Sequence, residues 1–144
     1  KQNWEQLKLK EGKSSVLEGV PKSLPALVKA SRIQEKVAGV GFDWEESNQV
    51  WEKVEEELQE FKMEVEHANK DQMESEFGDV LFSMINYARF LKINPENALK
   101  RTNKKFIKRF QYLEIKAKEI NKSLSEMTLA EMDIYWEKSK EFFK

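Results

Sequence analysis

The sequence of 144 residues predicts an all-α protein, a helical bundle of about five helices, on three observations. Apolar residues recur at intervals of three and four over long stretches, which is the period of an amphipathic helix, and no stretch alternates as a strand does. Five Gly and three Pro are too few for the many tight turns of an all-β fold. Charged residues make up 35% of the chain, which suits long solvent-facing helices.

The chain is short enough to form a single domain. Residues 1–22 are rich in Gly, Ser and Lys and have weak periodicity, so they predict an N-terminal arm or linker with a short helix near Trp4. Residues 23–144 predict one all-α domain. Its first helix runs from Leu24 to Ala38, with Ser23 as N-cap and Pro25 in the first turn.

The second helix is capped by Ser47 or Asn48 and extends to His67. One apolar stripe is expected to bury it, formed by Val50, Val54, Leu58, Phe61 and Val65. Asp71 and Glu74 have the spacing of a capping box for a third helix over 72–91. That helix is apolar nearly all round, which predicts a buried central helix.

Two further helices complete the predicted bundle. Asn94 as cap and Pro95 in the first turn begin a helix that extends to Asn121. Thr128 and Glu131 have the spacing of a second capping box, which opens a last helix to the C-terminus.

Composition excludes several functional classes. The absence of Cys removes disulfide frameworks, thiol nucleophiles and Cys-ligated zinc. No apolar run approaches the roughly 18 residues of a membrane span, so we expect a cytoplasmic protein without a membrane partner. The net charge of −1 argues against general nucleic-acid binding. Because the chain begins at Lys1 rather than Met, we expect that residue 1 is not the native start.

Opposite charges are concentrated in two blocks. Residues 52–79 contain eleven acidic and three basic side chains, whereas residues 100–118 contain eight basic side chains and one acidic side chain, Glu114. The blocks are either two solvated faces that attract each other, or two halves of one site that bind a metal and a phosphate.

Carboxylates lie in rows on the second and third predicted helices. One flank of the second helix presents Glu57, Glu60 and Glu64, and the third helix presents Glu76, Asp79 and Ser83. Packed antiparallel across a short loop, the two helices would bring four carboxylates to one place, where like charges repel unless a cation neutralises them. Oxygen ligands without Cys or His select Mg²⁺ or Mn²⁺. A solvated glutamate-rich helix is the alternative interpretation.

Two neighbouring features bear on this hypothesis. Gly78, directly before Asp79, weakens a helix and indicates a close approach at that point. Glu64 and His67 have the Glu-x-x-His spacing of a di-iron bundle, but such a site needs two pairs and the chain has one His. We therefore expect His67 to be an exposed residue near a helix end.

"EEELQE" followed by "ESEFGDVLF" resembles the Glu-Glu-x-x-Glu and Glu-x-x-Asp signature of the MazG-type nucleoside triphosphate pyrophosphohydrolases. Gln59 excludes the earlier of two registers, which leaves Glu56, Glu57 and Glu60 as the first half. "SLPALVKASRIQEKVAGVGFDW", "NKKFIKRF" and Trp136 are also similar to the C-terminal domain of bacterial MazG, in the same order. The resemblance covers nearly the whole chain.

The resemblance implies an all-α bundle completed by homodimerisation and Mg²⁺-dependent hydrolysis of nucleoside triphosphates (NTP or dNTP) to the monophosphate and pyrophosphate. Metal-activated water would attack the α-phosphate. By carry-over, the metal ligands are Glu57, Glu60, Glu76 and Asp79. The implied nucleotide-binding residues are Lys53, Lys105, Arg109 and Trp136. Two-domain members of the family also have an upstream second copy of this domain.

Chemistry agrees with these assignments. Arg101, Lys105 and Arg109 share one helical face that could hold phosphate oxygens. Trp136 could stack on a base or pack inside the protein. Glu56 is a candidate general base for the attacking water. The alternative function is a catalytically silent helical module for dimerisation or nucleotide binding.

Overall fold

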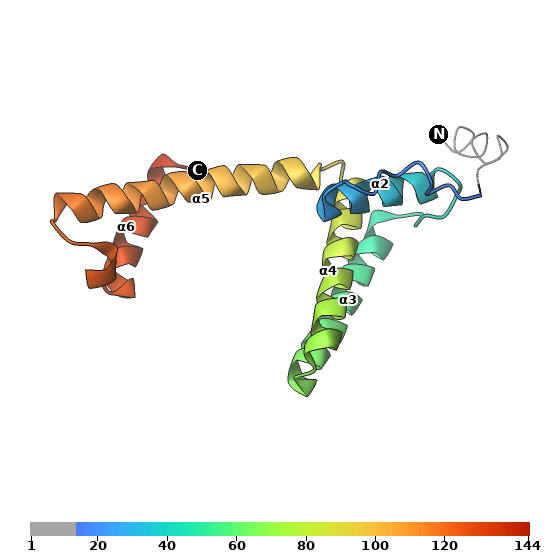
Figure 1. The fold of residues 1–144 in the computed structure, drawn as a ribbon, viewed down its shortest axis with the longest axis horizontal. Coiled ribbons are helices and arrows are strands. Elements are labelled where there is room, and N and C mark those ends of the chain that lie inside the picture. Colours follow the sequence, from blue (N-terminus) through green and yellow to red (C-terminus); the bar gives the residue numbers. More distant parts are fainter. Residues whose placement is uncertain (1–13) are drawn as a thin grey trace. The chain divides into compact units, whose positions relative to one another are not determined.

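The structure, a computed structural model, describes residues 14–144, and in that range it is all-α without strands, which confirms the predicted fold class. Its helices are α2 (Ala26–Ala38), α3 (Ser47–His67), α4 (Lys70–Phe90), α5 (Pro95–Glu119), the short 3₁₀ helix η1 (Leu124–Glu126) and α6 (Leu129–Phe142) (Figure 1). The helix predicted near Trp4 lies outside the described residues. The chain forms two compact units, of which the first ends at Glu96 and the second is Asn97–Lys144.

In the first unit, α3 and α4 form an antiparallel helical hairpin, and α2 packs against α4 (Figure 1). The turn of the hairpin consists of Ala68 and Asn69, and Ala68 adopts the left-handed conformation with φ 56°. Because the turn is so short, the chain is helical again at Lys70, and the side chain of Asn69 accepts a 3.2 Å hydrogen bond from the backbone N–H of Gln72. The predicted capping box at Asp71 is therefore wrong.

The start of α2 also differs from the prediction by two residues. Pro25 has ψ 146°, which is outside the helical region, so Pro25 is the cap and the helix begins at Ala26 rather than Leu24. The predicted cap of α3 at Ser47 or Asn48 is wrong, because Glu46 is the N-cap and Ser47 is already helical. The predicted start of α5 near Pro95 is correct. Gly41, with φ 94°, turns the chain away from α2.

The buried face of α3 is not the predicted apolar stripe along its whole length. Val50 and Val54 are almost fully buried, but Leu58 is 44% exposed and Val65 is 46% exposed. Glu57 takes the next buried position, with only 6% of its surface exposed. The predicted stripe consists of apolar residues alone. After Val54, however, the buried side of α3 includes Glu57 instead of Leu58.

The prediction of a fully buried α4 is also wrong for the described chain. Val80, Ser83 and Ile85 are buried on the side that faces α2 and α3. Phe77, Leu81 and Met84 lie along another stripe of α4 and stay about half exposed, with Phe77 also packed on Phe61 of α3. We call these three residues the outer face of α4.

The second unit has a small apolar core between α5, η1 and α6. Leu113, Ala117 and Met127 are buried there, and Phe110 and Tyr135 pack against them. The predicted capping box of α6 is confirmed: Thr128 Oγ1 accepts from the N–H of Glu131 at 3.1 Å, and Glu131 Oε1 accepts from the N–H of Thr128 at 3.0 Å. None of the described helices is both long and apolar enough to cross a bilayer.

Candidate metal centre

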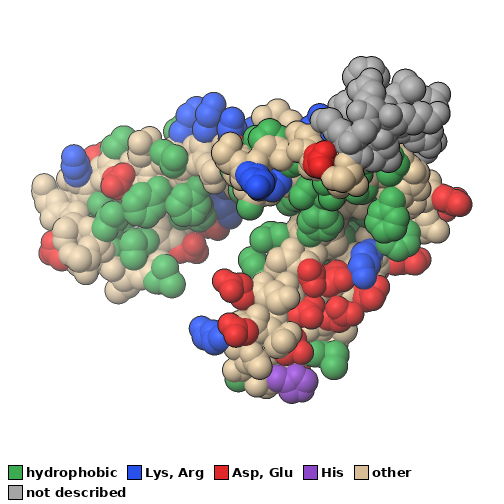
Figure 2. Space-filling view, turned by 45° about the vertical axis from the view of Figure 1, so that its right-hand side comes forward, with side chains coloured by type: hydrophobic (Ala, Val, Ile, Leu, Met, Phe, Trp, Pro, Cys, Tyr) green, Lys and Arg blue, Asp and Glu red, His purple; other side chains and the backbone are tan. Residues whose placement is uncertain are grey.

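Three carboxylates from α3 and α4 meet on the hairpin. Glu57, Glu76 and Asp79 each offer one oxygen, and these oxygens lie within 4.8 Å of one another. Figure 2 shows acidic side chains gathered over this part of the molecule. Glu57 is buried, Glu76 is half-buried and Asp79 is exposed, so the group extends from the helix interface to solvent. We call these three residues the carboxylate cluster.

Helical register explains why the three side chains meet. Glu57 lies three residues after Val54, so it continues the side of α3 that packs on α4. Glu76 and Asp79 are three apart and share one side of α4. Because the hairpin turn is only two residues long, the two rows lie opposite each other near the middle of both helices.

Two oxygens of the cluster have no partner among residues 14–144. Oε2 of Glu57 and Oε2 of Glu76 are buried and accept no hydrogen bond from the described residues. A buried charged acceptor without a partner is costly, and most such groups in proteins are paired or bind a metal. A set of carboxylate oxygens without Cys or His matches a hard cation such as Mg²⁺ or Mn²⁺. The residues therefore fit a divalent cation.

Lys53 is the cation that faces this cluster on α3. Its Nζ lies 3.0 Å from Oε1 of Glu57 and 3.5 Å from Oε1 of Glu56. The hydrogen bond to Glu57 is the main reason that the pKa of Lys53 is raised above its ordinary value. Lys53 thus neutralises Oε1 of Glu57, while Oε2 is buried and has no hydrogen-bond partner among the described residues.

Glu60 lies outside the group of three that meet within 4.8 Å. The charges of the cluster still act on Glu60. Its pKa is raised, first by the negative charge of Glu57, then by desolvation and by the charges of Glu76 and Glu56. Lys53 opposes this shift. The four acids predicted as metal ligands thus form one region of negative potential, of which three converge directly.

The structure does not support two details of the sequence interpretation. Gly78 is exposed, and a Cβ placed there would meet nothing within 4 Å, so no close approach within the described chain requires this glycine. Ser83 is buried, and its hydroxyl donates to the carbonyl of Val80 at 2.8 Å. The Ser83 hydroxyl therefore bonds within α4 and does not extend the row formed by Glu76 and Asp79.

The Glu64–His67 pair is at the end of α3, away from the packed interface. The side chain of His67 is 67% exposed, and its Nδ1 lies 4.0 Å from Oε2 of Glu64. This is the exposed position near a helix end that the sequence predicted for His67.

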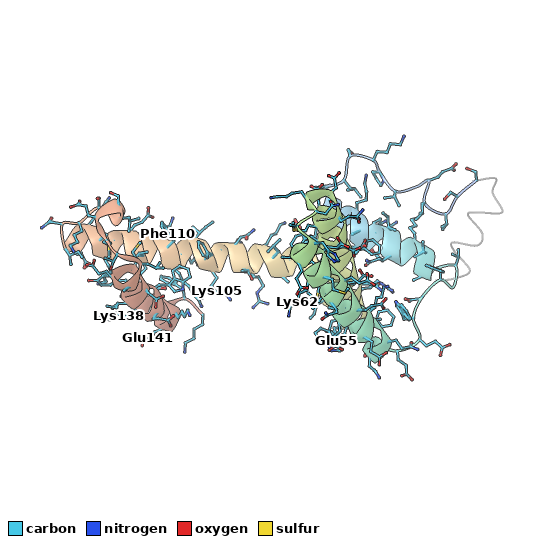
Figure 3. All side chains as sticks on the ribbon, turned by 90° about the horizontal axis from the view of Figure 1, so that it is seen from below. Glu55, Lys62, Lys105, Phe110, Lys138 and Glu141 are labelled. Carbon is cyan, nitrogen blue, oxygen red and sulfur yellow. The ribbon has the colours of Figure 1, made fainter. Side chains whose placement is uncertain are left out.

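The other candidate nucleotide ligands lie in the second unit. Lys105 and Arg109 are on α5, and Nε of Arg109 donates to the carbonyl of Phe143 at 2.8 Å. Trp136 on α6 packs against Phe106, with ring centroids 5.0 Å apart. Figure 3 labels Lys105 on α5 and Lys138 on α6.

A basic cavity of about 530 Å³ lies beside these residues, between the N-terminal half of α5 and the C-terminus. Its lining includes Arg101, Lys104, Lys105, Lys108 and Lys144. Arg101 and Lys105 therefore lie on one face, as their spacing predicted. Such a concentration of cations suits an anion.

Together, the helical fold and the carboxylate cluster define an all-α domain whose central hairpin presents acids suited to a hard divalent cation. Residues 45–113 match the family model of the MazG nucleotide pyrophosphohydrolase domain. Residues 45–113 are therefore a MazG-type domain. The matched segment contains the carboxylate cluster, Lys53, Glu56, Glu60, Lys105 and Arg109, whereas Trp136 lies beyond it.

Similar proteins cover almost the whole chain. It is 42% identical over 140 residues to a protein of Thermotoga maritima named nucleoside triphosphate pyrophosphohydrolase/pyrophosphatase MazG, with 95% of this chain and 54% of that protein aligned. The nucleoside triphosphate pyrophosphohydrolase of Escherichia coli K12 is 38% identical over 143 residues, with 95% of this chain and 54% of that protein aligned. The chain thus spans about half the length of these relatives.

A third relative is the Bacillus subtilis protein named uncharacterized protein YabN. It is 50% identical over 143 residues, which are 96% of this chain and 29% of that protein.

One buried polar group near the hairpin was not found by sequence reasoning. Gln34 on α2 is 3% exposed, its Nε2 donates to the carbonyl of Phe82 at 2.9 Å, and its Oε1 is buried with no partner that the described residues supply. No local pattern distinguishes this glutamine in the sequence, because its partner lies 48 residues away on α4.

Proposed function

We propose that this chain hydrolyses nucleoside triphosphates to the monophosphate and pyrophosphate with Mg²⁺, or Mn²⁺ in its place. One observation carries the proposal: three carboxylates from two helices converge within 4.8 Å, and two of their oxygens are buried without a partner in the described part of the chain. The names of the Thermotoga and Escherichia relatives support the reaction type. Because the chain spans about half of each, the activity is inferred for this segment.

Glu57, Glu76 and Asp79, with Glu60 beside them, would hold the cation. When bound, Mg²⁺ supplies Lewis acidity, which neutralises phosphate charge and makes a bound water more acidic. The protein contributes a fixed site, since α3 and α4 hold Glu57 and Glu76 at their interface. Lys53 orients Glu57 through their 3.0 Å contact.

Glu56 is our candidate for the general base that takes a proton from the attacking water. It lies one residue before Glu57 and is exposed, with Oε1 3.5 Å from Nζ of Lys53. An exposed carboxylate at the edge of the cluster can receive a proton and release it to solvent. If Glu56→Gln retained near wild-type turnover while Glu57→Gln abolished it, this role would be excluded.

For the triphosphate itself, we assign Lys105 and Arg109 to the phosphate oxygens and Trp136 to the nucleotide. Arg109 uses Nε to hold the carbonyl of Phe143, which leaves its terminal nitrogens for an anion. Lys105 lines the basic cavity of the second unit. Trp136 presents a half-buried ring that packs on Phe106.

We further propose that the active form is a homodimer. On the outer face of α4, Phe77, Leu81 and Met84 are 44–48% exposed and lie along one helical stripe. A continuous apolar face on a central helix is typical of a surface that packs on another copy. Leu81→Asp should then convert the dimer to a monomer in analytical ultracentrifugation. A wild-type chain that sediments as a monomer at micromolar concentration would contradict the proposal.

The decisive experiment identifies the inorganic product. Purified protein is incubated with ATP, GTP, CTP and UTP in Mg²⁺ or in EDTA, and pyrophosphate and orthophosphate are measured separately. We expect pyrophosphate alone, and only with Mg²⁺. Orthophosphate released from the γ position would exclude the assignment, and no product from any triphosphate would favour the catalytically silent module.

Matched variants connect the product to the carboxylate cluster. Asp79→Asn should lower kcat/KM by more than about 100-fold, because even residues that only support metal ligands affect activity by roughly 10–100-fold. The control is Asp71→Asn, the same chemical change at an exposed position on the same helix, which should stay near wild type. Equal losses in both variants would argue against a metal site at Asp79.

A further inference from the structure

The basic cavity of the second unit contains more positive charge than the hydrolysis proposal uses. Asn97–Lys144 has twelve basic and seven acidic side chains, so this unit is net positive although the whole chain has a net charge of −1. Lys105 lines the cavity, whereas Arg109 and Trp136 do not. The remaining cations of its lining have no role in that proposal: Arg101, Lys104, Lys108 and Lys144.

Four cations of the cavity form a row on one side of α5, at spacings of three and four residues: Arg101, Lys104, Lys105 and Lys108. Like charges at these spacings repel one another and destabilise a helix. Among residues 14–144, none of the four forms an ion pair with a carboxylate, whereas Lys116, Lys122 and Lys140 of the same unit each pair with a glutamate at 2.8–3.2 Å. The positive charge of the row is therefore available to a ligand.

An aromatic wall completes the cavity. Phe142 and Phe143 line it, and this segment is fixed to α5 because Nε of Arg109 donates to the carbonyl of Phe143 at 2.8 Å. The ring of Phe142 lies 5.6 Å from that of Tyr112 on α5, measured between centroids. Phe142 is nevertheless 64% exposed. The cavity thus combines a row of cations with an exposed aromatic ring.

This combination is typical of sites for single-stranded nucleic acid. Such sites have a positively charged groove that follows the phosphates and aromatic side chains on which bases stack. The row rises by about 10 Å from Arg101 to Lys108, and a stacked strand rises by about 3.4 Å per nucleotide, so the row matches about three nucleotides. A phosphate group without a base would use the cations but not the ring.

We propose that the basic cavity binds single-stranded nucleic acid, with the row of cations contacting phosphates and Phe142 stacking on a base. The net charge of −1 is summed over both units and does not describe this surface. Exposed charges act over only about 8 Å at physiological salt, so a strand in the cavity interacts mainly with the cations that line it. The inference goes beyond the proposed hydrolysis and does not depend on it.

Fluorescence anisotropy in EDTA, without nucleotide, tests the proposal on the whole chain. The probes are labelled RNA and DNA strands of about 12 nucleotides with the same sequence, and the comparison between them identifies the preferred sugar. We expect a Kd in the micromolar range at about 50 mM salt, with log affinity falling against log salt by about 0.7 for each phosphate contacted. Absence of binding to both strands at about 100 µM protein would overturn the proposal.

Lys104→Gln combined with Lys108→Gln removes two cations of the row. The double variant should bind at least about 10-fold more weakly at low salt, and its salt slope should be smaller by about 1.4. The matched control is Lys116→Gln with Lys118→Gln, which makes the same change in charge on α5 outside the cavity. Equal losses in the two double variants would overturn the proposal, because net charge would then explain the binding. An unchanged circular dichroism spectrum verifies the fold.

Phe142→Ala tests the stacking contact separately. It should weaken binding of the strand by at least about 5-fold, the lower end for a lost base–aromatic stack, and leave affinity for inorganic polyphosphate unchanged. Phe106→Ala is the control, because Phe106 on α5 is 56% exposed but does not line the cavity. Equal effects of Phe142→Ala on both ligands, or none on the strand, would overturn the assignment to nucleic acid.

A last comparison separates nucleic acid from other polyanions. Inorganic polyphosphate and vesicles containing phosphatidylserine compete with the labelled strand for wild type. We expect both to compete more weakly than unlabelled strand at equal phosphate concentration, because neither offers a base to Phe142. Competition as strong as that of the unlabelled strand would contradict the proposal and assign the cavity to another anion.

Discussion

The two units of this chain differ in where their charged side chains lie. In the first unit, the interface between α3 and α4 encloses Glu57 and half-buries Glu76, while apolar residues of α4 remain half exposed. In the second unit, Leu113, Ala117 and Met127 are inside, and exposed charges form local pairs such as Lys122 Nζ to Glu131 Oε2 at 2.8 Å.

This difference separates residues that stabilise the fold from residues that serve a ligand. A buried carboxylate oxygen without a partner reduces stability, whereas a buried leucine increases it. Functional sites are the places where proteins tolerate such costs. The second unit follows the ordinary rules of helix packing, and the α3–α4 hairpin departs from them at the carboxylate cluster.

The largest effect is expected in the core of the second unit. Leu113→Ala should lower the free energy of unfolding by about 2–5 kcal/mol, because Leu113 is 3% exposed and its removal leaves a cavity. Ile115→Ala on the same helix, where the residue is 58% exposed, should change it by less than about 0.5 kcal/mol. Chemical denaturation measures both, and equal losses would show that Ile115 is covered in solution.

In the hairpin, chemical denaturation should show no loss of stability when a carboxylate of the cluster is neutralised. Glu76→Gln removes a half-buried carboxylate, one oxygen of which has no partner among the described residues. It should therefore leave stability in EDTA unchanged or raise it, while lowering kcat/KM by more than about 100-fold. Glu74→Gln, an exposed acid on α4, is the control for both measurements. A strong destabilisation of Glu76→Gln in EDTA would mean that Glu76 supports the fold.

Mg²⁺ should stabilise the hairpin, and more at neutral than at acidic pH. The pKa of Glu60 is raised above 4.5, so the folded state binds this proton more tightly than the unfolded chain does. The repulsion between ionised Glu60 and the neighbouring acids is absent below pH 4.5 and fully present above the pKa of Glu60 in the folded state. At 100 times its Kd, Mg²⁺ should add about 2.7 kcal/mol.

Thermal unfolding with and without Mg²⁺ at pH 4.5 and 7.5 measures this difference, with Glu57→Gln as the variant expected to lose it. A Mg²⁺ effect of the same size at both pH values would contradict repulsion among the acids as its source.

The smallest effect is expected at the cap of α6. Thr128→Ala should lower the free energy of unfolding by about 1 kcal/mol, because the N–H of Glu131 loses its acceptor. The hydrogen bond from Lys122, followed by those from Thr128, lowers the pKa of Glu131 to about 2. The stabilisation by Glu131 is therefore complete above pH 4.5 and lost as pH falls toward 2. Glu131→Gln should make the denaturation midpoint depend less on pH over that range. A pH dependence equal to that of wild type would contradict this role.

Much of the carboxylate cluster was predictable from the sequence. Glu57, Glu76 and Asp79 were singled out by their types and spacing, and the structure brings these three together. Glu60 was placed with them, but only its electrostatic coupling to Glu57 and Glu76 is seen. The buried position of Gln34 was not predictable, because the carbonyl of Phe82 that it contacts lies 48 residues away along the chain.

The sequence by itself determined the helices and most of their ends. The Thr128–Glu131 box, the proline at the start of α5 and the turn at Gly41 act through hydrogen bonds and dihedral angles within a few residues, so a local pattern contains the whole cause. Only the tertiary structure decided which faces are buried. Glu57 is inside and Leu58 outside because packing depends on the partner helix, which no local pattern specifies.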